Sequence, residues 1–391
     1  MIRITQAVRA NQMNRFFEVA KLSFAHLIND IYAPVLMAIQ PVLIATLGYS
    51  YFEAALLPAL HSIVSSLLQP VFGYLADKKG MRVSVGISIL LSGIGVAALG
   101  ILQDKFMMML VCVAISGVGH ASFHPGALCK VSAIASSGDR GRLTSLFVVG
   151  GNLGFALGPI LAGIVLASGG ISSLVFLIIP AVLSAMILFM RKEPDSCMVP
   201  VKPCTSGEES WRPVILLFAG STLRSWVTFG AMVFLPTFLV LQGYPLLTAT
   251  TMVTVMLLAG VAGQISGGIL SDRIGRKAVI VATTLAAVPA FAGILVASGP
   301  WLMAAMILFG FMLWSSFAVT IAMSHELMPS QVGLISGLFL GVAMGAGGIG
   351  VSISGIIADH AGLPATLALF PVITLLASGI FLMVKNPPRH E

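Results

Sequence analysis

Charged side chains are scarce in this chain: Asp, Glu, Lys and Arg make up 9% of its 391 residues. A soluble domain carries about 25% of them, so the composition excludes an ordinary soluble protein. Cysteine is scarce as well, with four residues, which argues against a disulfide scaffold. What dominates instead is hydrophobic sequence, at 58% of the residues and a mean hydropathy of +1.02. The chain therefore belongs in a bilayer.

Long apolar runs account for most of the sequence. A helix needs about 20 apolar residues to cross a bilayer. Twelve runs of about this length, bounded by charges, Gly or Pro, lie near residues 18–46, 51–75, 83–102, 106–129, 142–167, 171–190, 212–241, 246–271, 278–298, 301–325, 331–358 and 364–384. The sequence predicts an all-α membrane protein with twelve transmembrane helices.

Basic residues mark one side of the membrane. Nineteen of the 21 lysines and arginines lie in the two termini and in alternate loops, whereas the opposite loops contain only Lys105. By the positive-inside rule, the basic side is cytoplasmic. We therefore expect a multi-pass protein of the cell (inner or plasma) membrane with both termini in the cytoplasm. The net charge of +7 follows from this topology, so no nucleic-acid partner is expected.

A ten-residue polar turn occurs twice. The segments Gly73–Arg82 and Gly268–Lys277 share Gly, Leu, Asp and Gly at one offset of 195 residues, and the same offset pairs residues in the flanking helices. Such a match predicts two copies of one unit. We expect six-helix bundles over residues 1–190 and 212–391, joined by a cytoplasmic linker over 191–211.

An acidic residue lies within the first apolar run. Asp30 follows Asn29, and His26 lies one helical turn earlier on the same face. A carboxylate near the membrane interior costs at least about 2.5–3.5 kcal/mol on insertion scales, so such a residue is a candidate for function. We predict that Asp30, supported by His26, is a proton-coupling group. The alternative is a structural hydrogen-bonding cluster that fixes this helix against a neighbour.

The fourth apolar run contains two histidines at the same spacing. His120 and His124 share a helix face, and Pro125 frees a backbone carbonyl near them. Histidines four residues apart can bind a metal, but no third ligand is adjacent in the sequence. We therefore predict a proton or anion site and no metal, with packing as the alternative. His61, alone in the second run, is expected to be a packing group.

One arginine lies deep within the seventh run. Arg224 is about 18 Å along the helix from Arg212, too far for its side chain to reach the surface. The second copy contains no deeply buried Asp or Glu, and the repeat offset places Arg224 opposite Asn29, next to Asp30. Two interpretations stay open. Either Arg224 and Asp30 neutralise each other across a central cavity, or Arg224 receives an anionic substrate while Asp30 carries a proton.

The duplicated twelve-run pattern, with polar turns after the second and eighth runs, resembles the major facilitator superfamily over essentially the full length. Within that superfamily the chain is similar to the fosmidomycin resistance proteins, on the segments His26, Asn29-Asp30, Phe123-His124-Pro125 and Gly150-Gly151-Asn152 to Gly158-Pro159. In those proteins an acidic residue tends to follow the His-Pro pair, whereas this chain has Gly126. The resemblance implies two bundles around a central cavity that opens alternately to either side.

The resemblance also implies a secondary transporter. We expect a monomer that exports a small organic compound or drug, anionic or phosphonate-like, in exchange for protons. No segment matches the nucleotide-binding pattern Gly-x-x-x-x-Gly-Lys-Ser/Thr, so an ion gradient must supply the energy. No cofactor and no enzymatic activity are expected. The alternatives are an importer or exchanger of a metabolic organic anion, and a non-transporting membrane sensor or enzyme.

The residues of the expected transport machinery form three groups. The predicted substrate-binding residues are Arg224, His120, His124, Asn29 and Asn152, the proton-coupling residues are Asp30 and His26, and the gating residues are Gly73, Asp77, Arg82, Gly268, Asp272 and Arg276. The gating residues are predicted to form a latch that holds the cytoplasmic side shut when the cavity faces outward. Gly73 is expected to permit close contact between helices.

Overall fold

A computed structural model describes residues 2–79, 83–135, 139–189 and 211–385, and these residues contain helices but no strand. The first half consists of α1 (Ile2–Ala38), α2 (Gln40–Leu47), α3 (Tyr51–Lys79), α4 (Val85–Ala97), η1 (Ala98–Gly100), α5 (Phe106–Ile134), α6 (Arg140–Gly169), η2 (Ile171–Leu177) and α7 (Ile178–Phe189). The second half consists of α8 (Trp211–Leu241), α9 (Leu246–Ile274), α10 (Arg276–Val296), α11 (Gly299–Leu327), η3 (Pro329–Gln331), α12 (Val332–Ser336), η4 (Gly337–Val342), α13 (Ala343–Ala361) and α14 (Leu363–Met383).

Most of these helices can cross a membrane. Ten of those described are long and apolar enough to do so, and the number is eleven if the pair Met13–Ala38 and Gln40–Leu47, bent by 43°, is one span. The bend precedes Pro41, which has no N–H to continue the hydrogen bonds of α1. The shorter apolar helix Val85–Gly100 lies where the third run was predicted. The predicted all-α membrane fold is confirmed.

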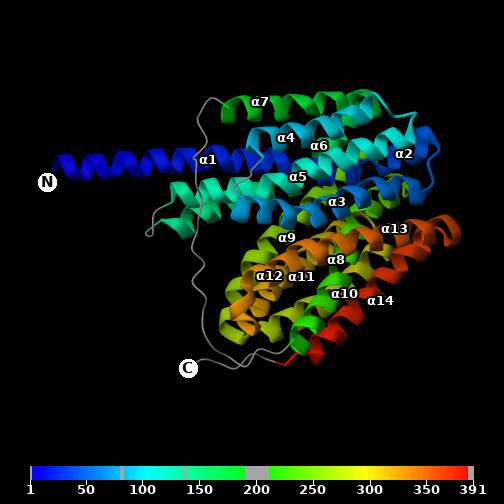
Figure 1. Cartoon of the computed structure of the whole chain (residues 1–391). Helices are drawn as coiled ribbons and strands as arrows, with labels where there is room; N and C mark the ends of the chain where they lie inside the picture. Colours follow the sequence, from blue (N-terminus) through cyan, green and yellow to red (C-terminus); the bar gives the residue numbers. More distant parts are fainter. Residues whose placement is uncertain (1, 80–82, 136–138, 190–210, 386–391) are drawn as a thin grey trace.

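The helices form two groups (Figure 1). Helices α1–α7 lie in the upper part of the view and α8–α14 in the lower part. Buried side chains of the first group form one apolar cluster, from Val19 to Ala181, and two further clusters lie mainly in the second group. The predicted linker falls almost entirely outside the described residues, so the domain boundaries at 190 and 212 stay a prediction.

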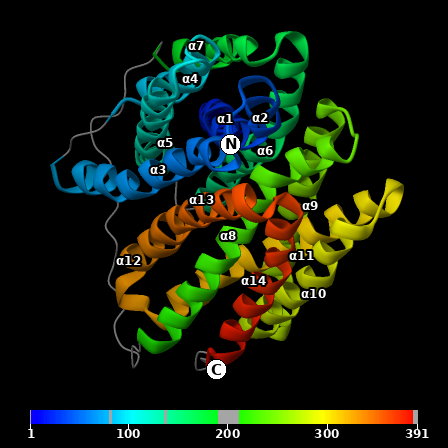
Figure 2. The ribbon, with the colours of Figure 1, turned by 90° about the vertical axis from the view of Figure 1, so that its right-hand side faces the viewer.

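The two groups meet through α3 with α13 and through α6 with α9 (Figure 2). At the end of the bundles away from the start of α1, Asp359 of α13 accepts hydrogen bonds from the backbone N–H groups of Tyr51 and Phe52, at 2.7 and 3.0 Å. Nearer the middle, the backbone N–H of Ile160 donates to Thr254 Oγ1 at 3.0 Å. The contacts named here therefore join the halves between their middle and one end.

Glycines bring α6 directly against α1. A methyl group at Gly150 would overlap the backbone oxygen of Ser23, and one at Gly154 would overlap that of Leu27. Since both glycines lie on one face of α6, the two helix backbones approach closely. This packing sets the position of the middle of α1.

Two cysteines lie in α5. Cys112 is a free, buried thiol, and Cys129 is disulfide-bonded. The low number of cysteines did not predict this bond. Cys197 and Cys204 lie outside the described residues.

Candidate functional site

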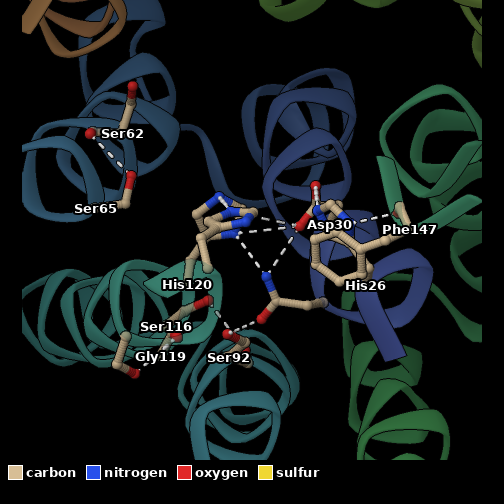
Figure 3. Close-up of polar contacts among 12 residues, drawn as sticks. His26, Asp30, Ser62, Ser65, Ser92, Ser116, Gly119, His120 and Phe147 are labelled. Atoms are coloured by element: carbon tan, nitrogen blue, oxygen red, sulfur yellow. Dashed lines mark hydrogen bonds and ion pairs between the residues drawn. The ribbon is translucent and has the colours of Figure 1, made fainter. Parts of the chain in front are cut away.

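Asp30 of α1 is the centre of a cluster of polar side chains (Figure 3). Its Oδ2 lies 3.1 Å from Nε2 of His26, one turn earlier on the same helix. The carboxylate is partly exposed, with 13% of the side-chain surface accessible. The pairing predicted from their spacing is therefore present.

Helix α6 holds the ring of His26 in place. The ring stacks on Phe147, with 4.2 Å between centroids, and its Nδ1 lies 2.9 Å from the backbone oxygen of the same residue. A methyl group at Gly151 would overlap the imidazole. The space that this glycine leaves is thus filled by the ring of His26.

The two histidines of α5 reach the same carboxylate. His120 Nδ1 and His124 Nε2 lie 3.9 and 3.8 Å from Oδ1 of Asp30. Their own Nε2 atoms are 3.2 Å apart. Because α5 continues without a break through Pro125, both rings leave the helix on one face. The structure therefore combines the α1 pair and the α5 pair in one cluster.

Asn29 links the cluster to α4. Its side-chain amide donates to Asp30 Oδ1 at 3.0 Å and lies 3.2 Å from His120 Nδ1. Its oxygen accepts a hydrogen bond from Ser92 Oγ at 3.0 Å, and Asn29 is fully buried. In this orientation of the amide, its nitrogen faces Asp30 and its oxygen faces Ser92. Sequence analysis missed Ser92, because a serine in an apolar run carries no distinguishing pattern.

Hydrogen-bond partners also assign the protons of the cluster. The backbone oxygen of Phe147 only accepts, so Nδ1 of His26 donates to it. Nε2 of His26 faces Asp30, so either an imidazolium donates to an ionised carboxylate or a protonated carboxyl donates to a neutral ring. His26 and Asp30 therefore share one proton beyond the one on Nδ1.

His61 of α3 is a further member that the sequence did not predict. Its ring centroid is 5.4 Å from that of His120, and its side chain is buried. Within the described part of the chain, its Nε2 has no hydrogen-bond partner. The sequence analysis expected His61 to be a packing group. The contact of α3 with α5 brings it to the cluster, and the sequence does not show that contact.

Arg224 lies in the other half, on α8. It is 4% exposed, and its Nη1 donates to Ser316 Oγ at 3.0 Å and to Thr320 Oγ1 at 3.2 Å, both on α11. Its Cζ lies 5.2 Å from the ring centroid of Phe317. One turn of α11 therefore holds the guanidinium with neutral groups only.

A small cavity of about 20 Å³, space for little more than one water molecule in this conformation, lies beside Arg224. It is lined by Arg224, Ser225, Thr228, Phe229, Leu313, Trp314, Phe317 and Met344. The ring of Trp314 also contacts Phe155 of α6, with 5.7 Å between centroids, so the cavity adjoins the boundary between the halves. One cation among aromatic and aliphatic side chains suits a small organic anion.

Arg224 and Asp30 form no ion pair in this structure. The ion-pair partners of Asp30 are all histidines, and none of the ion pairs formed within the described ranges includes Arg224. Of the two interpretations from the sequence, mutual neutralisation is therefore not the one seen here. The repeat offset identifies equivalent positions in the two copies, but it does not state which way each side chain points.

Asn152, the remaining predicted substrate-binding residue, is half-buried on α6. It lies three residues before Phe155, so both side chains lie on one face of the helix, the face that reaches Trp314. A role for Asn152 in binding stays a prediction.

The second predicted latch is present as an ion-pair network. Arg276 pairs with Asp272, one turn before it, and its Nε lies 3.0 Å from Oε1 of Glu326 on α11. All three residues belong to the second half. In this conformation the network joins α9, α10 and α11 and does not reach the first half.

Gly73 does not make the close helix contact expected of it in this conformation. A methyl group built on Gly73 or Gly268 has no neighbouring atom within 4 Å. The expectation of close helix contact at Gly73 is therefore wrong here. Arg82 and the side chain of Asp77 lie outside the described residues.

Comparison with known proteins accounts for this architecture. A family model described as Major Facilitator Superfamily matches residues 22–349 and 248–391. The chain belongs to the Major Facilitator Superfamily. As a member of this superfamily it is a multi-pass membrane transport protein with a small-molecule substrate, and it is not an enzyme.

Two curated relatives of this superfamily member are each 30% identical to it. One is the fosmidomycin resistance protein of Escherichia coli (strain K12), matched over 390 residues, and the other is the uncharacterized MFS-type transporter YfnC of Bacillus subtilis (strain 168), matched over 387. Both alignments cover 95% of this chain and 93% of the relative. The predicted similarity to the fosmidomycin resistance proteins is confirmed.

Solved structures of transporters share the fold. A bacterial homolog to the human lysosomal transporter Spinster, in an inward-facing and occupied conformation, has a TM-score of 0.81 at 15% identity, covering 94% of this chain and 96% of that one. The nucleoside transporter NupG has a TM-score of 0.76 at 14% identity, covering 95% and 99%. At these identities the likeness establishes the fold alone.

Proposed function

We propose that this protein is a proton-coupled exporter of a small organic anion, working by alternating access as an antiporter. The observation that carries the proposal is Arg224, which is buried, lines a cavity and, among the described residues, has only neutral hydrogen-bond partners. A buried charge without a counter-charge is costly. A bound anion supplies the missing counter-charge and removes that cost, so its binding is favourable in free energy.

The anion is a carboxylate or a phosphonate-like group. Ser316 and Thr320 engage only Nη1 of Arg224, and the planar guanidinium offers further N–H donors for a bidentate contact. From the first half, we propose that His120, His124, Asn29 and Asn152 contribute hydrogen bonds to the substrate. The name of the Escherichia coli relative, a fosmidomycin resistance protein, supports export of a compound of this kind.

Proton coupling is assigned to Asp30 and His26. The two groups share a proton across 3.1 Å, and their side chains are partly accessible. The pair can therefore take up or release a proton without breaking its hydrogen bond to Phe147. His26 and Asp30 lie in a different half from Arg224, so the proton is held apart from the arginine. Most of the proposed substrate-binding residues of the first half contact the same carboxylate, so the substrate and the proton meet at the Asp30 cluster.

The remaining assignments follow from charge and packing. We propose that the two termini, which carry basic residues, lie in the cytoplasm. The protein itself is proposed to lie in the plasma or inner membrane. The polar turns are proposed to close this side when the cavity opens outward, with Gly73, Asp77 and Arg82 in one turn and Gly268, Asp272 and Arg276 in the other. The unit of transport is proposed to be a monomer.

Transport in proteoliposomes tests the proposal. Fosmidomycin and a panel of organic anions and cations are offered under an imposed proton gradient. We expect anions to be transported. Arg224→Lys should weaken transport, and Arg224→Ala should lower it at least about tenfold, because it removes at least one charged hydrogen bond. Arg212→Ala, which removes an exposed arginine of the same helix, is the control. A substrate list made only of cations would refute the anion site, and net uptake into cells would indicate an importer.

A further inference from the structure

We propose that the cluster around Asp30 is also a binding site for a divalent transition-metal ion, for which Zn²⁺ serves as the probe. The proposed ligands are Nε2 of His26, the carboxylate of Asp30 and Nε2 of His124. The sequence predicted no metal because the histidine pair of α5 lacked a third ligand nearby. In the fold, His26 and Asp30 of α1 supply the further ligands beside His124. His120 of α5 is a fourth candidate.

The distances fit a compact coordination sphere. The candidate ligand atoms of the three residues all lie within 4.8 Å of one another. Nε2 of His26 and Oδ2 of Asp30 are 3.1 Å apart, and Nε2 of His124 and Oδ1 of Asp30 are 3.8 Å apart. Ligands in a tetrahedral zinc site, at about 2.0–2.1 Å from the metal, are roughly 3.4 Å apart. Small rotations of the imidazole of His124 bring the set to that spacing.

The surroundings of His26 match those of a metal-binding histidine. Such residues almost always use one ring nitrogen for the metal and donate the other N–H to a carbonyl or carboxylate. In this structure Nδ1 of His26 is engaged by the backbone oxygen of Phe147 at 2.9 Å, which leaves Nε2 for the ion. The stacking on Phe147 holds the ring in that orientation without a metal.

His120 is placed to be the fourth ligand. Its Nε2 lies 3.2 Å from Nε2 of His124. Its Nδ1 now faces the amide nitrogen of Asn29, so binding through Nε2 requires the Asn29 amide to turn over. Ser92 can follow this change, because its hydroxyl can accept a hydrogen bond as well as donate one. Without that change, a water completes the site.

The ligand types favour particular ions. Imidazole suits Zn²⁺, Cu²⁺ and Ni²⁺, whereas Mg²⁺ and Ca²⁺ prefer oxygen ligands throughout. The side chains of Asp30, His120 and His124 are 13–17% exposed, so an ion can reach them. This inference does not depend on the direction of transport or on the substrate of the Arg224 cavity.

Metal binding to the purified full-length protein tests the inference. Zn²⁺ is titrated in competition with a chromophoric chelator, and we expect one ion per chain. His124→Ala and Asp30→Asn should each weaken binding by at least about 10–100-fold, the effect of removing even a hydrogen-bond partner of a metal ligand. His360→Ala, which removes an exposed histidine outside the cluster, should leave the affinity unchanged.

A second measurement covers variants that fail to fold. X-ray absorption of the zinc-loaded wild-type protein should show at least two imidazole nitrogens in the first coordination shell. A shell of oxygen atoms only would overturn the proposal. So would an affinity that stays within twofold of wild type in both ligand variants, or one that falls as far in His360→Ala as in His124→Ala.

Discussion

His26 shows how one side chain depends on residues that carry no chemistry themselves. Its ring fills the space over Gly151, stacks on Phe147 and reaches Asp30. Two of these neighbours lie on α6, about 120 positions later in the chain. The position of the proposed proton-coupling pair of α1 therefore depends on the contact between α1 and α6.

We predict that Gly151→Ala disrupts the site. The added methyl group overlaps the His26 ring, and overpacking of this kind costs about 1–3 kcal/mol. Thermal unfolding should occur at lower temperature, and proton-driven transport should fall. Gly379→Ala on α14 is the matched control, because a methyl group there meets no atom within 4 Å. Equal effects of the two changes would contradict the packing argument.

A second prediction concerns the carboxyl group itself. Asp30→Asn keeps the shape but removes the group that exchanges a proton with His26. Transport driven by a proton gradient should be lost, while exchange of substrate across the membrane without a gradient should persist. Both are measured in proteoliposomes, with Asp104→Asn, a change of an exposed loop carboxylate, as the control. Accumulation against a gradient by Asp30→Asn would remove Asp30 from the coupling step.

At the scale of the elements, α3 and α13 make a contact that any opening of the far end must break. Asp359 of α13 accepts hydrogen bonds from the first two N–H groups of α3, at Tyr51 and Phe52. Those N–H groups lie at the positive end of the helix dipole and have no partner within their own helix. Ser50 caps α3 by accepting from the backbone N–H of Glu53, and a carboxylate from the other half accepts from the two N–H groups that this cap leaves.

We predict that Asp359→Ala favours opening of this end. Loss of a capping side chain costs about 0.5–2 kcal/mol, which shifts a balanced equilibrium severalfold. Spin labels placed on α3 and α13 near this end should show a larger population at long distance. His360→Ala, next in sequence and also exposed, should leave the distance distribution as in the wild type. An unchanged distribution in Asp359→Ala would rule out a gating role.

Much of this organisation could be predicted from the sequence, and the limits have physical causes. Apolar length set the spans, and a spacing of four residues set the His26–Asp30 and His120–His124 pairs. Which helices meet depends on side-chain packing between them, so neither the meeting of these pairs nor the presence of His61 and Ser92 was predicted. The pairing of Arg224 with Asp30 was one of two interpretations of the sequence and is absent here. A sequence repeat identifies equivalent positions in the two copies, but not the direction in which each side chain points.

At the scale of the whole molecule, the polar sites are divided between the halves. The Asp30 cluster draws on α1, α3, α4 and α5, whereas Arg224 and its partners belong to α8 and α11. Each set is complete within one half. A motion of one half against the other can therefore preserve both sets while the distance between them changes.

This division gives a further prediction. If Asp30 and Arg224 were a structural ion pair, the double variant Asp30→Asn with Arg224→Gln would restore what each single change removes. Since each residue has its own partners, we expect the double variant to lack concentrative transport as the single variants do. Substrate counterflow and proton-driven uptake measure this directly. Recovery in the double variant would show that the two charges act as a pair.

Separate charges in the two halves also have an electrical consequence. With their shared proton, His26 and Asp30 together are neutral, and a further proton makes them positive. Arg224 is positive when empty and neutral beside a monoanion. A cycle that carries one anion out and one proton in moves two positive charges inward, and a membrane potential of 100 mV contributes about 4.6 kcal/mol to it. Voltage alone, with no difference in pH, is then sufficient to drive the protein.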